Sequence, residues 1–266
     1  MTAAIGRAAI APVLEGPDPR SALASQLLAG EAAQVTEELG AWRHLVLTGG
    51  TASGWVHSGY LVETSEGEAR AWQSRAAWSS GVLIQEGTVR RWMPLRGRLA
   101  LADGDVELPG GGMARIIHGE VRPLARVQSE ARRVPPEEWA LGHFAGAPYL
   151  WGGITPGGVD CSGLVQTTFL ARGIDLPRNA ARQSALGTEV PRHAMRAGDL
   201  IFFHGETGSA VEHVAFAGSD ATVIHASLAA GGVVRESWLP GAPAAALMER
   251  VVALRRIHEA SGGATG

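Results

Sequence analysis

The sequence is poor in cysteine, in lysine and in basic charge. Cys161 is the single cysteine, so no disulfide can form within the chain and hydrophobic cores must hold the fold. All 23 basic residues are arginines, and 26 acidic residues bring the net charge to −3. With a pI near 6.3, the chain has no positive field that would attract nucleic acid or an anionic lipid surface. We therefore expect no nucleic-acid partner.

Long apolar runs are also absent. No stretch reaches the ~18 residues that a membrane span needs, so we expect no membrane insertion. The apolar run at residues 3–14 contains Arg7 and is followed by Glu15, which makes a poor secretory signal. We therefore expect a cytoplasmic protein. One cysteine and scattered histidines form no ligand cluster of the structural-zinc type, so neither a metal nor another cofactor is expected.

What is present is an ordinary globular composition, with 45% hydrophobic and 18% charged residues. In the first part of the chain, turn residues recur about every 8–12 positions between short apolar runs, a pattern typical of a small all-β barrel. We expect Trp42, Trp55 and Tyr60 to lie in the core of this barrel. The predicted strands cover residues 9–14, 21–28, 33–38, 41–47 and 54–60.

A second region repeats this composition with weaker spacing. Its first predicted strand contains Ala71-Trp72, and the glycine run at residues 109–112 predicts a hairpin tip. A second, divergent barrel is therefore expected. Residues 129–138 are charged and contain two prolines, which predicts a linker in which a helix starts at Pro136.

The pattern changes to mixed α and β after residue 139. An aromatic strand at Tyr149 leads through a glycine-rich turn to Asp160, which stands at the N-cap position of a helix that opens with Cys161 and ends near Gly173. Unpaired N–H groups at a helix N-terminus favour the thiolate, so we expect a Cys161 pKa well below the ~8.5 of free cysteine. The alternative is an inert buried cysteine.

A nucleophilic thiol needs a base and a group that orients the base. Among nine histidines, His213 and His225 lie on consecutive predicted strands joined by a turn at residues 218–220, and a three-residue loop would place them directly opposite each other. Without Cys161, His213 would be interpreted as a core histidine. We expect surface or structural roles for His44, His57, His118, His143, His193, His204 and His258.

Five motifs in this order resemble the NlpC-type cell-wall peptidases of papain-like fold, over about residues 139–257. They are Pro148-Tyr149-Leu150-Trp151-Gly152-Gly153, Asp160-Cys161-Ser162-Gly163-Leu164, Gly198-Asp199-Leu200-Ile201-Phe202-Phe203, His213-Val214-Ala215-Phe216 and Ile224-His225-Ala226. The run Gly30-Glu31, Gln34 to Trp42 and Gly54-Trp55-Val56 likewise resembles the bacterial SH3-like domain.

These resemblances imply a multidomain protein with two small all-β SH3-like barrels followed by an α+β papain-like cysteine peptidase domain. The expected domains are a first barrel at 1–66, a second at 67–128, a linker at 129–138, the peptidase domain at 139–258 and a disordered tail at 259–266.

The resemblance implies that Cys161 is the nucleophile, His213 the general base and His225 the residue that orients it. The family hydrolyses peptidoglycan stem peptides, commonly between γ-D-glutamate and a diamino acid. Substrate-binding roles are implied for Tyr149, Asp160, Ser162, Arg178 and Asn179. The last two lie in a predicted short helix at residues 176–183.

Relatives with two barrels commonly have arginine, aspartate and serine where this chain has Arg178, Asn179 and Ala180. Their acid and hydroxyl help to bind a free N-terminal ammonium, so this chain lacks two expected partners of that group. Two other functions agree less well with the sequence. An acyltransferase or thioesterase of related fold usually has histidine before cysteine, and a non-catalytic wall-binding protein would not need Cys161, His213 and His225 intact.

Overall fold

The computed structural model describes residues 2–258 of the 266-residue chain. The predicted disordered tail, 259–266, lies outside the described residues. The chain forms two compact units. Unit 1 contains the described residues up to Glu130 together with Leu150–Val159, and unit 2 contains Ala131–Tyr149 and the described residues from Asp160 onward. The chain therefore leaves unit 2 after Tyr149 and returns to it at Asp160.

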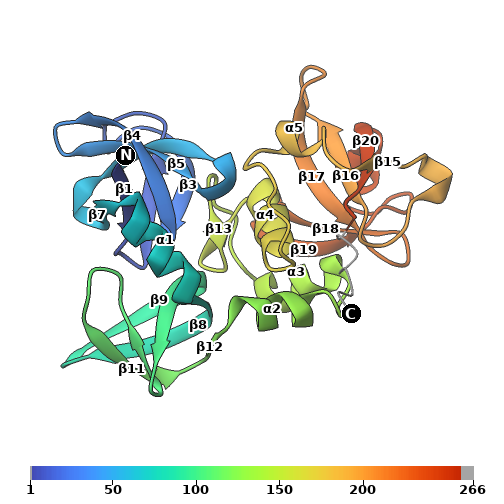
Figure 1. Ribbon diagram of the computed structural model, residues 1–266. Coiled ribbons are helices and arrows are strands. Elements are labelled where there is room, and N and C mark those ends of the chain that lie inside the picture. Colours follow the sequence, from blue (N-terminus) through green and yellow to red (C-terminus); the bar gives the residue numbers. More distant parts are fainter. Residues whose placement is uncertain (1, 259–266) are drawn as a thin grey trace, which may run out of the picture. The chain divides into compact units, whose positions relative to one another are not determined.

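Unit 1 begins with a seven-stranded antiparallel sheet in the order β3-β2-β6-β5-β4-β1-β7 (Figure 1). One face of this sheet is covered by small and branched apolar residues, among them Val13, Leu27, Leu45 and Val56, all fully buried. The strands are β1 (Thr2–Gly6), β2 (Ile10–Leu14), β3 (Leu23–Leu28), β4 (Ala32–Leu39), β5 (Trp42–Leu47), β6 (Ser53–His57) and β7 (Leu61–Ser65). The predicted strands in this region are present, and β1 and β7 were not predicted.

The expected core position of the aromatic residues in this sheet is wrong. Trp42 pairs with His57 and His44 with Trp55 across β5 and β6, so the four rings lie on one face of the hairpin. The rings meet edge to face at 5.4 and 5.3 Å, and both tryptophans are partly exposed. Tyr60 is 39% exposed. The core is built instead from the alternate residues of the same strands, such as Leu45 and Val56.

A second sheet in unit 1 has the order β11-β10-β9-β8-β12, and an additional pairing of β11 with β8 closes four of its strands into a ring. The predicted hairpin tip at residues 109–112 lies between β10 and β11. These strands are β8 (Ala76–Glu86), β9 (Val89–Ala102), β10 (Asp105–Glu107), β11 (Met113–His118) and β12 (Val121–Arg122). The SH3-like class of the two sheets stays a prediction.

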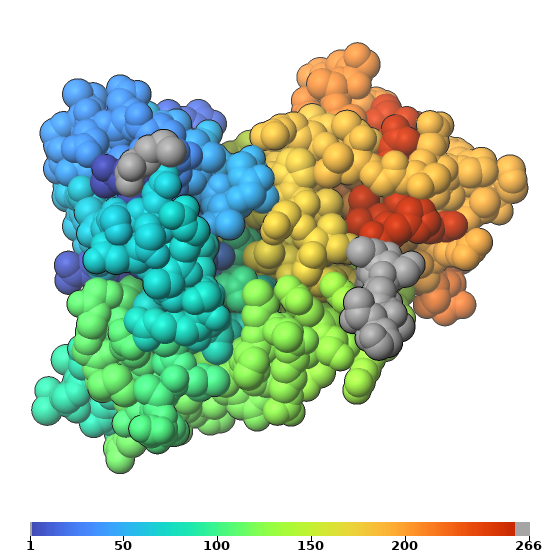
Figure 2. Space-filling view, in the orientation of Figure 1, coloured from blue at the N-terminus to red at the C-terminus, as the bar shows by residue number. Residues whose placement is uncertain are grey.

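Helix α1 (Glu66–Arg75) lies where a strand at Ala71-Trp72 was predicted. A capping box starts it: the Ser65 hydroxyl accepts from the Glu68 N–H, and the Glu68 carboxylate accepts from the Ser65 N–H. The helix lies at the surface of unit 1 and contacts strands of both sheets (Figure 2). Its Trp72 indole N–H donates to the Gly30 carbonyl at 2.9 Å, and Gly30, at φ +75°, leaves no room for a Cβ beside Arg98.

The segment from Leu150 to Val159 packs within unit 1 and forms a small hairpin of β13 (Ile154–Thr155) and β14 (Gly158–Val159). The Ile154 N–H donates to the Gln26 side-chain carbonyl at 3.0 Å, and a side chain at Gly152 would collide with the Leu23 carbonyl. Ten residues of the predicted peptidase domain, 139–258, therefore belong to the compact unit of the N-terminal sheets.

The predicted linker, 129–138, is largely helical. Helix α2 (Leu124–Ala131) runs into it, and α3 (Pro136–Phe144) starts at the predicted proline. Proline suits the first helical position because its missing N–H would have no partner there.

Unit 2 contains a six-stranded antiparallel sheet in the order β15-β20-β16-β17-β18-β19. Helix α4 (Cys161–Leu170) packs on β17 and β18, with Phe169 against Phe216 at 6.0 Å (Figure 1). The remaining elements are β15 (Thr188–Glu189), β16 (Leu200–His204), β17 (Val211–Ala217), β18 (Thr222–Ser227), β19 (Gly232–Ser237), β20 (Val251–Arg256), α5 (Ala180–Gln183) and α6 (Ala245–Met248).

The architecture is therefore α+β, with a β-rich N-terminal region as expected. Within residues 2–258, no helix has the length and apolar character needed to cross a membrane. The cytoplasmic location stays a prediction.

Candidate active site

Cys161 opens helix α4, as the sequence predicts. The Asp160 carboxylate accepts a hydrogen bond from the Gly163 N–H at 2.7 Å, which is the geometry of an N-cap. Every residue of α4 except Leu170 is buried, and Cys161 is 6% exposed. The thiol is therefore fixed at the N-terminus of a helix whose position is determined by the core of unit 2.

The predicted low pKa of the thiol is wrong for the free protein. Burial raises the pKa of Cys161 to about 11, and the Asp160 carboxylate adds to the rise. Hydrogen bonds from the backbone N–H groups of Val214 and Ser162, and the charge of Arg178, lower it by less. The helix N-terminus does stabilise the thiolate, but loss of water around the sulfur outweighs that effect.

Val214 lies on strand β17 directly after His213, so its hydrogen bond to the Cys161 sulfur places the sulfur beside that strand. His213 is partly exposed, and its ring lies 5.7 Å from that of Phe203, its partner on β16. The predicted nucleophile thus contacts the backbone of β17 at the residue next to the predicted base.

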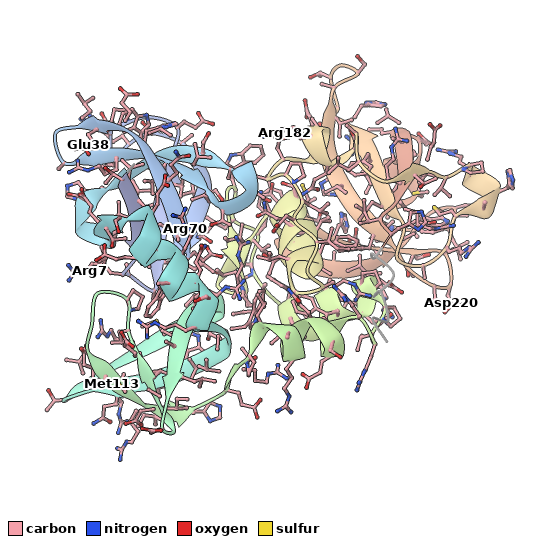
Figure 3. The ribbon with its side chains drawn as sticks, viewed as in Figure 1. Arg7, Glu38, Arg70, Met113, Arg182 and Asp220 are labelled. Carbon is pink, nitrogen blue, oxygen red and sulfur yellow. The ribbon has the colours of Figure 1, made fainter. Side chains whose placement is uncertain are left out.

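The two histidines are not directly opposite each other. Phe216 pairs with Ile224, so His213 and His225 are two positions out of register. The loop between the strands has four residues instead of three, and its Asp220, labelled in Figure 3, and Ala221 both have φ +54°. The imidazoles still meet, since diagonal neighbours of a sheet are within reach of long side chains.

A hydrogen-bonded chain of three side chains results. His213 Nε2 and His225 Nδ1 are 2.8 Å apart, and His225 Nε2 is 3.0 Å from a carboxylate oxygen of Glu236. Burial, together with the charges of His225 and Arg250, lowers the pKa of His213 to about 3. Burial also lowers the pKa of His225, although Glu236 opposes this shift. Both imidazoles are therefore neutral at pH 7, and His213 can accept a proton.

Sequence reasoning missed Glu236. It lies on β19, where Val223 pairs with Glu236 and His225 with Val234, so the carboxylate reaches His225 diagonally. Residues 232–237 follow a second turn and carry two valines, which is a strand signal. Extending the predicted hairpin by one strand would have placed Glu236 near His225.

Asp160, Ser162 and Arg178 meet in a buried cluster next to Cys161. Arg178 donates two hydrogen bonds to the Asp160 carboxylate, at 2.9 and 2.6 Å, and a third to the Ser162 hydroxyl at 3.0 Å. These predicted substrate-binding residues bind one another in the free protein. Together they form a buried, hydrogen-bonded cluster beside the thiol.

Tyr149 is partly exposed and lies within electrostatic reach of the thiol. Its N–H donates to the Gly231 carbonyl, and Pro148 forms an isolated bridge with Gly232 in place of the predicted strand. Burial raises the pKa of Tyr149 to about 12, and negative charge on Cys161 and Asp160 adds to the rise. The phenol therefore stays protonated and can donate a hydrogen bond.

Asn179 is exposed and its side-chain carbonyl accepts from the Arg182 N–H at 2.9 Å, so it caps α5. This short helix covers only the end of the predicted one at 176–183. Ala180, the first residue of α5, is buried. Asn179 and Ala180 thus place a neutral amide and a methyl group at the two positions where the family resemblance implies an acid and a hydroxyl.

The Gly198-Asp199 motif has a structural role. The Asp199 carboxylate is buried, accepts from the Arg196 N–H at 2.8 Å and pairs with Arg256 of β20 at 2.7 Å. It fixes the turn into β16 and attaches that strand to its neighbour.

The site contains a thiol at a helix N-terminus and a neutral imidazole that is hydrogen-bonded to a second one. Such groups can perform nucleophilic acyl transfer. Among residues 2–258, no group of three His, Cys, Asp or Glu side chains is arranged to hold a metal ion.

Fold and site together define an α+β protein with a thiol and an imidazole suited to acyl-transfer chemistry. Residues 146–249 match the NlpC/P60 family. The Escherichia coli protein named Probable endopeptidase NlpC is 35% identical over 121 residues, which are 45% of this chain and 78% of that protein. The chain belongs to the NlpC/P60 family.

Other relatives share shorter segments. The γ-D-glutamyl-L-lysine dipeptidyl-peptidase of Bacillus subtilis is 50% identical over 72 residues, 27% of this chain and 24% of that protein. The murein DD-endopeptidase MepS/murein LD-carboxypeptidase of Escherichia coli is 39% identical over 128 residues, 45% of this chain and 67% of that protein. The chain spans about a quarter of the length of the two dipeptidyl-peptidases that it matches.

The architecture as a whole also occurs in a solved structure. A crystal structure of an NlpC/P60 family protein from Bacillus cereus superposes with a TM-score of 0.75 at 22% identity, over 96% of this chain and 99% of that one. The likeness includes the β-rich N-terminal region and not the peptidase domain alone.

Proposed function

We propose that the protein cleaves the bond between γ-D-glutamate and the diamino acid in peptidoglycan stem-peptide fragments, with Cys161 as nucleophile, His213 as general base and His225 as the group that orients it. This proposal rests on two contacts at adjacent residues of β17, one with the Cys161 sulfur and one with His225. Val214 holds the sulfur, and the adjacent His213 lies 2.8 Å from His225.

The reaction starts from two neutral groups. His213 Nε2 is engaged with His225, so Nδ1 is the nitrogen that takes the Cys161 proton as the sulfur attacks the γ-glutamyl carbonyl carbon. The carbonyl oxygen becomes an oxyanion, for which the backbone N–H of Cys161 is a suitable donor. The tetrahedral intermediate collapses, His213 gives its proton to the departing amine, and a thioester remains on Cys161.

Hydrolysis of the thioester repeats these steps with water. His213 Nδ1 takes a proton from the water as its oxygen attacks the thioester carbonyl, and returns that proton to the leaving sulfur. The products are a free γ-carboxylate, a free amine on the diamino acid and the original thiol. Because burial lowers the pKa of His213, the imidazole is unprotonated across the physiological range and has a lone pair available for the proton.

The choice of bond is supported by the name of the Bacillus subtilis relative, a γ-D-glutamyl-L-lysine dipeptidyl-peptidase, which is 50% identical where it matches. Tyr149 is proposed to donate its phenolic hydrogen to the substrate near the thiol. The cluster of Asp160, Ser162 and Arg178 is proposed to form the rigid wall of the binding site, and Asn179 its exposed rim.

The experiment is mass spectrometry of L-Ala-γ-D-Glu-L-Lys and L-Ala-γ-D-Glu-meso-diaminopimelate after incubation with the protein. We expect release of L-Ala-γ-D-Glu and the free diamino acid, and no release by the Cys161→Ala variant. His193→Ala is the matched control for His213→Ala, because His193 is exposed and lies outside the site. Cleavage at another bond, or equal turnover by Cys161→Ala, would contradict the proposal.

A further inference from the structure

Glu236 terminates the hydrogen-bonded chain that starts at His213. Its carboxylate lies 3.0 Å from His225 Nε2, and its side chain is 21% exposed, whereas that of His225 is 4% exposed. An ionised carboxylate has acceptors and no donor. The contact therefore requires that His225 Nε2 carries a hydrogen.

The position of this hydrogen also determines where His213 carries its hydrogen. A neutral imidazole with hydrogen on Nε2 has its lone pair on Nδ1, so His225 Nδ1 must accept. The group 2.8 Å away, His213 Nε2, must then donate. A neutral His213 with hydrogen on Nε2 has its lone pair on Nδ1, the nitrogen that the proposed reaction needs as a base.

We infer that Glu236 is a positioning residue that fixes the tautomers of both histidines, and thereby keeps His213 Nδ1 free to take the thiol proton. The catalytic part of this inference depends on the proposed function, but the tautomers do not. With the carboxylate removed, His225 could carry its hydrogen on Nδ1 and donate to His213 Nε2. His213 would then hold its hydrogen on Nδ1 and could not act as the base through that nitrogen.

Burial and the charge of Arg250 favour the neutral form of His213, and burial does the same for His225. Burial does not select one ring nitrogen over the other. Because the Glu236 carboxylate can only accept, it places the hydrogen of His225 on Nε2. The contact between the two rings then places the hydrogen of His213 on Nε2 as well.

The test is nitrogen-15 NMR of labelled histidine in the free full-length protein at pH 7, with His213 and His225 assigned from variants at each position. Neutral imidazole tautomers give distinct nitrogen shifts. In the unmodified protein we expect hydrogen on Nε2 of both rings.

Three substitutions change the hydrogen-bonding capacity of position 236 in steps. Glu236→Gln keeps an acceptor and should leave Nε2–H as the major tautomer of His213. Glu236→Met keeps the length without an acceptor and should give a mixture. Glu236→Lys offers donors only and should shift His213 toward Nδ1–H. Glu212→Gln is the control, since it removes the same charge from the residue before His213 and its carboxylate lies against Gly205.

Turnover adds a second readout. A mixture of tautomers should lower kcat of the Met variant only a few-fold, because many molecules keep the productive form. The Lys variant should lose on the order of 100-fold, within the ~10²–10⁴-fold range of a general base, with KM little changed. Thermal melting identifies variants that do not fold, and the Met variant still tests the tautomer if the Lys variant is among them. Nδ1–H on His213 in the unmodified protein, or unchanged Nε2–H on His213 in a folded Met or Lys variant, would overturn the inference even if the peptide is cleaved as proposed.

Discussion

The Asp160 carboxylate and the Arg178 guanidinium form a buried ion pair with two hydrogen bonds, 2.9 and 2.6 Å long, directly beside Cys161. Asp160 also caps α4, and Arg178 also holds the Ser162 hydroxyl. The pair therefore connects the start of the nucleophile helix to the segment before α5. Its charges act on the thiol in opposite directions, since Asp160 raises the pKa of Cys161 and Arg178 lowers it.

Arg178→Met should destabilise the protein strongly, because it leaves the Asp160 charge buried without its cation. We expect the free energy of unfolding to fall by about 3–5 kcal/mol, as for other broken buried pairs. Chemical denaturation measures this. Arg182→Met, at the exposed arginine labelled in Figure 3, is the control and should cost little. The double variant Asp160→Asn/Arg178→Met should recover most of the loss, and a loss below 1 kcal/mol for Arg178→Met alone would contradict the expectation.

The Cys161 thiol should titrate far above an ordinary cysteine. Its pKa of about 11 exceeds the ordinary 9.0, so the folded protein binds this proton more tightly than the unfolded chain does. The resulting stability is fully present below pH 9 and is lost as pH rises from 9 through 11. Thiolate absorbance in the ultraviolet, and unfolding between pH 8 and 11 compared with Cys161→Ala, measure the two effects. Iodoacetamide alkylation with an apparent pKa below ~8.5 would show that an ion pair with His213 forms in the free protein.

The two histidines should differ in their effect on turnover. His213→Ala removes the base and should lower kcat nearly as far as Cys161→Ala, because residues that act as a unit are not additive. His225→Ala removes only the group that orients the base and should cost less. Stopped assays on the free tripeptide measure both. Equal loss in a folded His225→Ala protein would mean that the role of His225 is more than orienting the base.

The site was predictable where local chemistry determines it. A short acidic side chain directly before an apolar helical pattern indicates an N-cap, and Asp160 caps α4 in the structure. The order of Cys161, His213 and His225 carried the family resemblance. The register of the two histidines was not predictable to one residue. Ala221 belongs to the turn at φ +54°, a conformation that a non-glycine residue rarely adopts, and the pairing of Ala217 with Val223 beyond this turn shifts the register by two positions.

The remaining errors have tertiary causes. Trp72 is part of a helix because a capping box at Ser65 and Glu68 starts it, a local signal that competes in the sequence with the barrel pattern. The thiol pKa depends on how completely the core removes water from Cys161, and nothing in the residues around it reports that quantity. Glu236 acts through the pairing of β18 with β19, which the local pattern alone does not set.

The amide at position 179 should weaken the preference for a free N-terminal amine. The Asn179 carbonyl caps α5 and its side chain carries no charge, so it offers an ammonium no opposite charge. Aspartate caps helices as well as asparagine does, so Asn179→Asp adds a negative charge while α5 keeps its cap. Turnover of L-Ala-γ-D-Glu-meso-diaminopimelate and of its N-acetylated form, measured for both proteins, gives the ratio that decides. We expect kcat/KM for the free amine to rise about 5-fold relative to the acetylated peptide, the effect of about 1 kcal/mol from a partly exposed ion pair. Asn179→Ser keeps a capping group without charge and should leave the ratio unchanged.

If all three proteins fail to cleave the acetylated peptide to the same degree, the amine is recognised elsewhere and position 179 serves only to start α5.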